Sequence, residues 1–461
     1  MSTTALILAA GEGTRMKSAL PKVAHEVLGV PMVRHVVDAV REAGVERVVV
    51  VTGHGAEVVE SLLGNAGVEF VRQTEQHGTG HAVLCAEPLL GETDGSLLIV
   101  AGDCPLFTSE TLGALIAERD REGAAAVVLT TRLDDPAGYG RIIRGGLGGI
   151  TAIVEDRDLT PEQRSITEIN TSTYCFDARS LFAHLQRLEN SNAQGEYYLT
   201  DMIAVLRAEG LAVGVLQAAD ATETLGINTR VQLAEAGRVL QQRINERHML
   251  AGVTMTDPGM VWIGPDVKLG RDVMIEPMTR LMGDTVIGDG SVLGPDTRIT
   301  DSVIGACCTV DSSIVTGCTL GDRVTVGPRA YLRPGTVMGA DSKAGTSVEI
   351  KNSQIGDGSK VPHLSYIGDA EVGRGVNIGA GTITCNYDGV RKHRTVVGDG
   401  AFIGSDTMLV APVEIGEGAF TGAGSAIAHD VPPRALAVER TEQRTIEEWA
   451  ARKREGSQDD A

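Results

Sequence analysis

An aliphatic residue recurs every six positions through much of the second half of this 461-residue chain. The longest unbroken run in this register consists of Ile263, Leu269, Ile275, Leu281, Ile287, Leu293 and Ile299. A period of six matches neither the 3.6-residue repeat of an amphipathic helix nor the two-residue repeat of a half-buried strand. It is typical of a parallel β-helix of hexapeptide repeats, in which each aliphatic side chain points into a prism-shaped interior.

Glycine follows many of these aliphatic residues. The dipeptide Ile-Gly begins at positions 263, 287, 304, 355, 367, 378, 403 and 415. Glycine can turn the corner of a coil without a Cβ penalty, and the chain contains 57 glycines but only 3% aromatic residues. The alternative, a glycine-rich β-sandwich, would not hold one period over such a length. We therefore predict a left-handed parallel β-helix over residues 251–440.

The first half of the chain shows a different pattern, in which short apolar runs alternate with amphipathic segments. The apolar runs at 6–10, 47–53 and 96–103 predict buried parallel strands. The segments at 32–44 and 109–123 predict helices that end at glycine. This order predicts a Rossmann-like, doubly wound α/β domain. The predicted organisation has four parts, which are residues 1–228, a linker helix at 229–250, the β-helix at 251–440 and a polar tail at 441–461.

Composition and charge exclude several classes of protein. With 41 basic and 61 acidic residues, the formal charge of −20 disfavours nucleic acid as a partner. No apolar run approaches the roughly 18 residues of a membrane span, and no basic residue precedes the first apolar stretch as in a signal peptide. The seven cysteines lack a C-x-x-C motif, which predicts free thiols and no metal cluster. We expect a cytoplasmic protein that binds no membrane.

A glycine-rich loop follows the first predicted strand and has the sequence G-E-G-T-R-M from Gly11. It is not a dinucleotide fingerprint, because Met16 replaces the last glycine, and the chain has no P-loop. Gly11 allows backbone N–H groups to approach an anion, and the helix start expected after the loop would add partial positive charge. Arg15 and Lys22 would supply full charges for a triphosphate. The alternative is an ordinary turn with solvated bases.

Two further polar segments follow predicted strands. Asp103 ends the strand at 96–103, where a carboxylate is well placed for Mg²⁺, with Asn228 as a second oxygen donor. A simple helix cap is the alternative for Asp103. In the second segment Gln73 is a candidate to read a base edge, and Gly78 and Thr79 are candidates to pack against the base or its ribose.

Together these motifs resemble the sugar-nucleotide pyrophosphorylases. The shared motifs are G-E-G-T-R-M, Pro21-Lys22, Q-x-x-Q-x-G-T-G-H-A from Gln73, G-D-x-P-L from Gly102, G-Y-G-R-I from Gly138 and E-I-N-T from Glu168. With the hexapeptide half attached, residues 1–440 are similar to the bifunctional uridylyltransferase/acetyltransferase branch of these enzymes.

The resemblance implies a nucleotide site in the α/β domain. UTP would contact Leu8, Ala9, Ala10, Gly11, Lys22, Gln73, Gly78 and Thr79. The amino sugar would contact Gly140, Glu155, Asn170 and Asn228, and Mg²⁺ would bind Asp103 and Asn228. The chain departs from the family pattern at Ala101, where some relatives carry Tyr, and at Ser172, where Gly is frequent. Both departures lie in the expected sugar pocket and would loosen or reshape it.

The same resemblance implies an acetyltransferase site in the β-helix. His363 would be the base that takes a proton from the attacking amine, with Glu349 orienting or charge-balancing its imidazole. Glucosamine-1-phosphate would contact Arg333, Lys351, Tyr366 and Asn377, and acetyl-CoA would contact Ala380, Asn386, Tyr387, Ser405, Ala423 and Arg440. Outside the family motif, a surface turn histidine after Pro362 would be the favoured interpretation of His363. Ser347 replaces a frequent Phe, and the basic run at 391–394 is expected to be solvated or to face the CoA phosphates.

The leading hypothesis is therefore one homotrimeric chain with two active sites. Glucosamine-1-phosphate is acetylated with acetyl-CoA, and the N-acetylglucosamine-1-phosphate is then uridylylated with UTP and Mg²⁺ to give UDP-N-acetylglucosamine for envelope synthesis. One alternative keeps only nucleotidyl transfer, with the β-helix as a regulatory or oligomerising arm. Another is a non-enzymatic, pyrophosphorylase-like assembly subunit.

Overall fold

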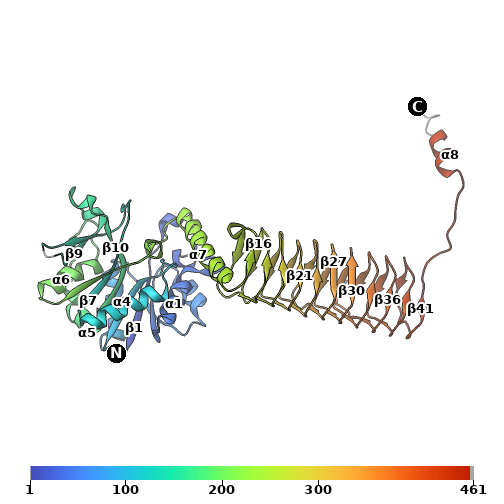
Figure 1. The fold of residues 1–461 in the computed structure, drawn as a ribbon, viewed down its shortest axis with the longest axis horizontal. Helices are drawn as coiled ribbons and strands as arrows, with labels where there is room; N and C mark the ends of the chain where they lie inside the picture. Colours follow the sequence, from blue (N-terminus) through green and yellow to red (C-terminus); the bar gives the residue numbers. More distant parts are fainter. Residues whose placement is uncertain (1, 147, 457–461) are drawn as a thin grey trace. The chain divides into compact units, whose positions relative to one another are not determined.

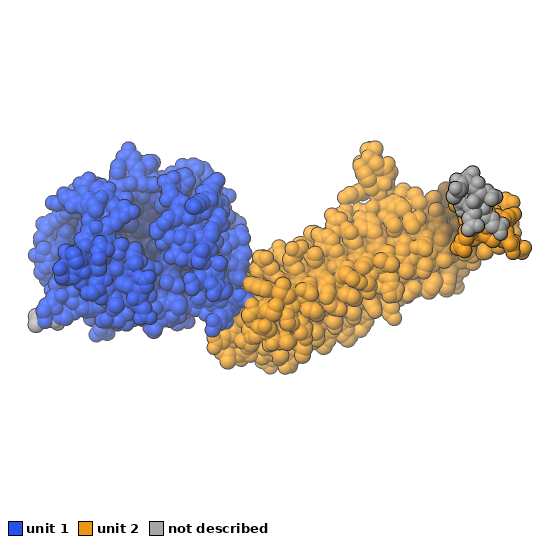
Figure 2. All heavy atoms as spheres, turned by 90° about the horizontal axis from the view of Figure 1, so that it is seen from above, with its two compact units in different colours: residues 1–244 blue, residues 245–461 orange. Residues whose placement is uncertain are grey.

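The computed structural model describes residues 2–146 and 148–456, and the chain divides into two compact units, residues 1–244 and residues 245–461 (Figure 2). Helix α7 (Arg230–Leu250), which corresponds to the predicted linker helix, contains the point of division. The predicted tail contains helix α8 (Trp449–Gly456), and its last residues, 457–461, lie outside the described residues. In the described part of the chain no helix has the length and apolar character of a membrane span.

Unit 1 is built on one twisted sheet whose main strands lie in the order β11-β7-β10-β6-β1-β4-β5. These strands are β1 (Thr3–Ala9), β4 (Arg47–Thr52), β5 (Glu69–Arg72), β6 (Ser96–Ala101), β7 (Ala126–Arg132), β10 (Glu168–Asp177) and β11 (Val213–Gln217). The three apolar runs are confirmed as β1, β4 and β6, and both neighbours of β1 run parallel to it.

The sheet is mixed, however, rather than wholly parallel. Strand β10 runs antiparallel to both of its neighbours, β6 and β7, and a hairpin of β8 (Arg141–Arg144) and β9 (Ile150–Val154) adjoins it. The sequence of β10, E-I-N-T-S-T-Y-C-F-D, mixes polar and apolar residues, so no apolar run predicted this strand or its direction. The antiparallel strand carries residues of the expected sugar site.

Helices cover both faces of this sheet, as expected for a doubly wound domain (Figure 1). One face packs against α3 (Thr79–Leu90), α5 (Ala178–His184) and α6 (Met202–Ala208), and the other against α1 (Met32–Glu42), α2 (Ala56–Leu63) and α4 (Ser109–Glu122). Gly123 ends α4 with a φ of 58°, a left-handed conformation that favours glycine. The helices predicted at 32–44 and 109–123 are thus confirmed.

The glycine-rich loop differs from its expectation. It is followed by a single 3₁₀ turn, Thr14–Met16, and not by the start of an α-helix. Gly13 and Lys17, on either side of the turn, both have left-handed backbone conformations, which stop it from propagating. A helix dipole therefore does not contribute charge here, and the positive charge of the loop comes from its side chains.

Unit 2 is a β-helix of three parallel sheets, seen as the long stack of short strands in Figure 1. The sheets run from β12 (Thr254–Met255) to β41 (Leu436–Ala437), from β13 (Val261–Ile263) to β40 (Ala426–Ile427) and from β14 (Lys268–Leu269) to β38 (Val413–Ile415). Ile263 pairs with Leu281, which pairs with Ile299, so three six-residue steps complete one coil. The aliphatic run is buried except for the partly exposed Leu269. The predicted hexapeptide β-helix is confirmed.

Candidate active sites

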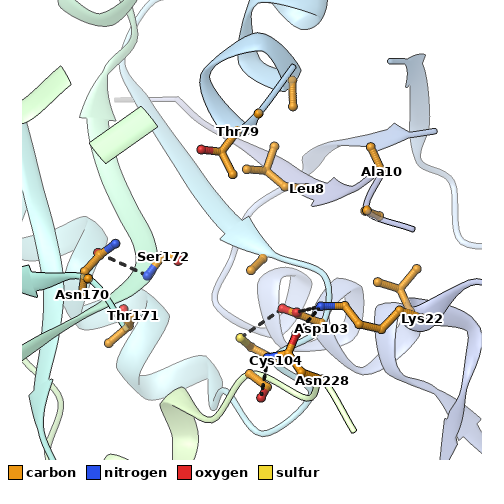
Figure 3. Close-up of a pocket in the computed structure, with 18 of the residues that line it drawn as sticks. Leu8, Ala10, Lys22, Thr79, Asp103, Cys104, Asn170, Thr171, Ser172 and Asn228 are labelled. Carbon is orange, nitrogen blue, oxygen red and sulfur yellow. Dashed lines mark hydrogen bonds and ion pairs between the residues drawn. The ribbon is translucent and has the colours of Figure 1, made fainter. Parts of the chain in front are cut away.

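A cavity of about 440 Å³ opens in unit 1 at the carboxyl ends of the parallel strands β1 and β6 (Figure 3). This edge is where open α/β sheets generally bind ligands. Apart from Arg15, every residue predicted for this site lines the cavity: Leu8, Ala9, Ala10, Gly11, Lys22, Gln73, Gly78, Thr79, Asp103, Gly140, Glu155, Asn170 and Asn228. The structure thus brings together residues that are far apart in the sequence.

Lys22 lies at the centre of the charged part of this cavity (Figure 3). Its Nζ forms an ion pair with Oδ2 of Asp103 and donates to Oδ1 of Asn228 at 3.0 Å. Arg15 does not line the cavity, but its Nη2 donates to the same Asn228 oxygen at 2.8 Å. The side chains of Lys22 and Asp103 are only 14% and 17% exposed, so a phosphate here would meet weakly screened charges.

The oxygens of Asp103 and Asn228 fit the ligand preference of Mg²⁺. Both oxygens contact the ammonium group of Lys22, so in this structure they are arranged around a positive charge. Among the described residues no cluster of three or more His, Cys, Asp or Glu side chains is arranged to hold a metal ion. A magnesium site commonly uses one or two carboxylates together with substrate phosphates and water. The donor set is therefore consistent with Mg²⁺ held jointly by the protein and a nucleotide.

The loop before α3 holds its three predicted residues rigidly. Gln73 Nε2 donates to the carbonyl of Gly78 at 3.1 Å, and Thr79 Oγ1 accepts the backbone N–H of Leu199 at 3.1 Å. Gly78 has a φ of 100°, and a Cβ there would lie 2.7 Å from the carbonyl oxygen of Tyr197. Only glycine fits this position, and the loop presents its backbone to the cavity.

Sequence reasoning did not single out two residues of the cavity wall. Gln76 donates from Nε2 to the carbonyl of Ala10 at 2.9 Å and so connects the α3 loop to the end of β1. Gln76 is the second glutamine of the Q-x-x-Q motif, and this motif was the sequence feature that could have identified it. The thiol of Cys104 donates to Oδ1 of Asp103 at 3.5 Å, and burial raises the pKa of this thiol well above its usual value. Cys104 is therefore a neutral donor to the predicted metal ligand.

Asn170 lies in an irregular part of β10, where the register with β7 shifts between Asn170 and Tyr174. Its Oδ1 accepts the backbone N–H of Ser172 at 3.2 Å, and its Nδ2 donates to the hydroxyl of Tyr174 at 2.8 Å. Ser172 has a φ of 56°, in the left-handed region. The backbone here accounts for a preference for glycine, and the serine adopts the same conformation.

Glu155 lines the cavity next to Gly140. Thr200 donates its hydroxyl to Oε1 of Glu155 at 3.1 Å. Burial raises the pKa of Glu155, and the carboxylates of Asp201, Asp158 and Asp156 act in the same direction. Among the described residues that line the cavity, this side therefore offers hydrogen-bonding groups and no cation, as a neutral sugar ring requires.

In unit 2, three of the four residues predicted to contact glucosamine-1-phosphate, Arg333, Lys351 and Tyr366, lie on or directly after successive strands of one sheet. These strands are β25 (Tyr331–Leu332), β28 (Glu349–Lys351) and β31 (Tyr366–Gly368), and β34 (Ile383–Cys385) follows them in the sheet. Arg333 follows β25 and donates from Nη1 to Oε1 of Glu349 at 2.9 Å. Glu349 therefore balances the charge of Arg333. The expected contact with the imidazole of His363 is not among the hydrogen bonds of the described residues.

Lys392 is a further member of this cationic group. It comes from the insertion between β34 and β35 (Thr395–Val397), and its contact with the ammonium of Lys351, together with the nearby charge of Arg333, lowers the pKa of Lys392. The basic run at 391–394 was expected to be solvated or to face the CoA phosphates, and Lys392 in this run lies near Lys351 and Arg333. An anion between these cations would relieve their mutual repulsion.

The remaining predicted residues follow one corner of the stacked coils. His363 ends β30 (Lys360–His363) at this corner with an exposed side chain, and Asn377 of β33 (Asn377–Ile378) pairs with Lys360 of β30. On the next coils, the carbonyl of Ala380 accepts the N–H of Asp406, and the carbonyl of Ser405 accepts that of Gly424. These hydrogen bonds stack the predicted acetyl-CoA residues above one another.

Two of the predicted acetyl-CoA residues lie in the insertion and one near the end of the β-helix. Tyr387 pairs with Lys392 across the insertion, and its hydroxyl donates to the carbonyl of Gly389 at 2.6 Å. Asn386, which begins the insertion, is buried. Arg440 donates from Nη1 to the carbonyl of Ala423 at 3.4 Å. Two residues that were predicted separately for the acetyl-CoA site, Arg440 and Ala423, are therefore in contact.

Comparisons with known proteins agree with this architecture. Residues 5–207 match the MobA-like NTP transferase domain, and residues 266–301 and 394–429 match the six-repeat bacterial transferase hexapeptide family. A bifunctional protein GlmU from Heliobacterium modesticaldum is 53% identical over 99% of both chains. Another from Streptomyces avermitilis is 50% identical over 98% of this chain and 95% of the relative. This chain belongs to the family of bifunctional GlmU proteins.

Proposed function

We propose that the two sites carry out consecutive steps of UDP-N-acetylglucosamine synthesis through the residues described above. The chain is a bifunctional enzyme, a uridylyltransferase and an acetyltransferase. Membership of a bifunctional enzyme family argues against both the nucleotidyl-transfer-only interpretation and the non-enzymatic subunit. The observation that carries the proposal is that each unit gathers cations into a separate group, around Lys22 in unit 1 and around Lys351 in unit 2.

In unit 1, the phosphate of N-acetylglucosamine-1-phosphate attacks the α-phosphorus of UTP, and pyrophosphate leaves from the opposite side. Such a transfer needs alignment and charge stabilisation but no enzyme nucleophile. Lys22 and Arg15 balance the charge of the phosphates, while the loop of Gln73 and Thr79 holds the uridine. Asn170 and Glu155 hold the sugar. Mg²⁺, held by Asp103 and Asn228, would supply further neutralisation of the phosphate oxygens.

In unit 2, the amine of glucosamine-1-phosphate attacks the thioester carbonyl of acetyl-CoA. A C–N bond forms, the C–S bond breaks, and CoA leaves as the thiol. His363 accepts the proton that the amine loses and returns it to the departing sulfur. Arg333, Lys351 and Lys392 hold the sugar phosphate, and Tyr366 and Asn377 hold the sugar. The corner residues Ala380, Ser405 and Ala423, together with Asn386, Tyr387 and Arg440, line the path of acetyl-CoA.

The proposal includes three properties of the whole protein. A homotrimer is supported by the hexapeptide repeats, which are typical of trimeric transferases. A cytoplasmic location is supported by the seven cysteines, all of which are free: Cys85, Cys104, Cys175, Cys307, Cys308, Cys318 and Cys385. The partners are the small-molecule substrates, without nucleic acid or membrane.

Removal of divalent metal tests whether uridylyl transfer in unit 1 needs a metal ion and acetyl transfer in unit 2 does not. With UTP, N-acetylglucosamine-1-phosphate and Mg²⁺, we expect pyrophosphate release that stops with excess EDTA and returns with added Mg²⁺. With glucosamine-1-phosphate and acetyl-CoA, we expect the free thiol of CoA to appear at the same rate with and without EDTA. Pyrophosphate release that resists EDTA, or acetylation that needs metal, would contradict the proposal.

A further inference from the structure

Asp369 occupies a corner of the β-helix directly after β31, and its side chain is only 14% exposed. It was not among the predicted site residues. Each of its carboxylate oxygens accepts from two side chains. Oδ1 accepts from Asn352 at 2.7 Å and from Lys351 at 3.3 Å, while Oδ2 accepts from Asn386 at 2.6 Å and from Lys351 at 3.2 Å. Asp369 therefore connects residues of three successive coils.

The donors explain the charge state of this carboxylate. Burial opposes ionisation of Asp369, but the hydrogen bonds from Asn352, Lys351 and Asn386 outweigh it and lower the pKa of Asp369. The group is thus a carboxylate at neutral pH. Its negative charge also favours the placement of Lys392 next to Lys351, because it offsets part of the repulsion between their ammonium groups.

Two of the three donors belong to different substrate sites of the proposed acetyl transfer. Lys351 is proposed to bind the sugar phosphate, and Asn386 begins the insertion proposed to meet acetyl-CoA. A lysine side chain loses about 2 kcal/mol of rotamer entropy when it is fixed. If a carboxylate fixes it before the substrate arrives, this cost does not reduce the affinity for the phosphate.

We propose that Asp369 is a positioning residue for acetyl transfer, which holds the ammonium of Lys351 and the amide of Asn386 in the geometry that the two substrates require. It does not itself touch the reacting atoms. The inference rests on the proposed roles of Lys351 and Asn386, and the experiment below separates a failure of those roles from a failure of the inference.

The substitution Asp369→Asn tests this directly in the full-length enzyme. An asparagine keeps one acceptor oxygen, but its NH₂ group would face Lys351 and a second amide, which are both donors. We expect the KM for glucosamine-1-phosphate to rise about tenfold and the KM for acetyl-CoA to rise less, with kcat within about threefold. The melting temperature of the folded variant is measured alongside.

Asp301→Asn is a matched control. Asp301 occupies the same kind of corner, directly after β19 (Arg298–Thr300), which lies four strands before β31 in the same sheet. It has a φ of 48° against 51° for Asp369, and it is exposed. Its Oδ1 accepts only a backbone N–H, that of Asp284 at 3.0 Å, among the hydrogen bonds of the described residues. We expect unchanged KM values for both substrates. A KM increase equal to that of Asp369→Asn would overturn the proposal, because it would reflect a general loss of coil geometry.

A double-variant cycle separates positioning from structure. Lys351→Gln alone should raise the KM for glucosamine-1-phosphate, and adding Asp369→Asn should raise it little further, because Asp369 acts through Lys351. Fully additive increases, or an Asp369→Asn enzyme with the KM of the unsubstituted protein, would overturn the inference alone. A Lys351→Gln enzyme with unchanged KM would instead contradict the proposed role of Lys351.

Discussion

Gly368 has no side chain, and this leaves room for two side chains of the proposed acetyltransferase site. It ends β31, and the ends of the Tyr366 and Asn386 side chains pass directly over its Cα. A Cβ at this position would lie 2.6 Å from Cζ of Tyr366 and 2.8 Å from Nδ2 of Asn386. Both neighbours are proposed to bind substrate, so a methyl group at Gly368 would displace two side chains of the site.

We therefore predict that Gly368→Ala lowers kcat/KM for acetyl transfer at least tenfold, roughly the loss of one well-placed hydrogen bond, while pyrophosphate release is unchanged. The control is Gly358→Ala, where a Cβ has open space but φ is 67°. That variant should lose about 1 kcal/mol of stability and keep its acetyltransferase activity. If Gly368→Ala acetylates at the normal rate, these two side chains do not bind the substrates.

At the scale of an element, an ion pair connects the start of β10 to β8, in which Glu168 is buried and the side chain of Arg144 is 40% exposed. Glu168 is 4% exposed, and its carboxylate accepts from Nη2 and Nε of Arg144 at 2.6 and 2.8 Å and from the hydroxyl of Thr130 at 3.1 Å. The hydrogen bond to Arg144 lowers the pKa of Glu168, against the opposing effect of burial. Two residues later the same strand carries Asn170.

We predict that Glu168→Gln lowers the free energy of unfolding of unit 1 by about 1–3 kcal/mol at pH 7. Because the folded-state pKa lies below the usual 4.5, the carboxylate contributes fully above pH 4.5 and loses its contribution as the pH falls through the folded-state value. The difference between the two proteins should shrink below pH 4.5 in urea titrations. Glu118→Gln, in the exposed pair of Glu118 and Arg121, should change little. A difference that is constant with pH would rule out the ion pair as its cause.

The elements also show which parts of the fold were predictable. A six-residue period specifies which residues stack, because every third step returns to the same sheet, so Arg333 and Lys351 were expected to come together. The direction of β10 was not predictable, because its mixed sequence contains no apolar run that would mark the strand, and side chains alternate between the two faces whichever way a strand runs. The contacts of Lys392 and Asp369 were not predictable either, because they depend on where long side chains point at a corner, which the period does not encode.

At the scale of the whole molecule, a chain with a formal charge of −20 handles anionic substrates at two places. Exposed charges are screened beyond about 8 Å at physiological ionic strength, so the cations next to a bound substrate determine its electrostatic attraction, and the net charge of the chain does not. In unit 1 Lys22 and Arg15 both donate to Oδ1 of Asn228, and in unit 2 Lys392 lies next to Lys351. Sequence motifs predicted most of these residues, and only the structure shows their pairing.

The central claim is that one chain contains two chemically independent active sites, and two substitutions in the full-length enzyme test it most directly. His363→Ala should abolish CoA release from acetyl-CoA and glucosamine-1-phosphate while pyrophosphate release from UTP and N-acetylglucosamine-1-phosphate continues. Asp103→Asn should have the reverse effect. If either substitution silences both reactions in a protein that remains folded, the account of two separate sites is contradicted.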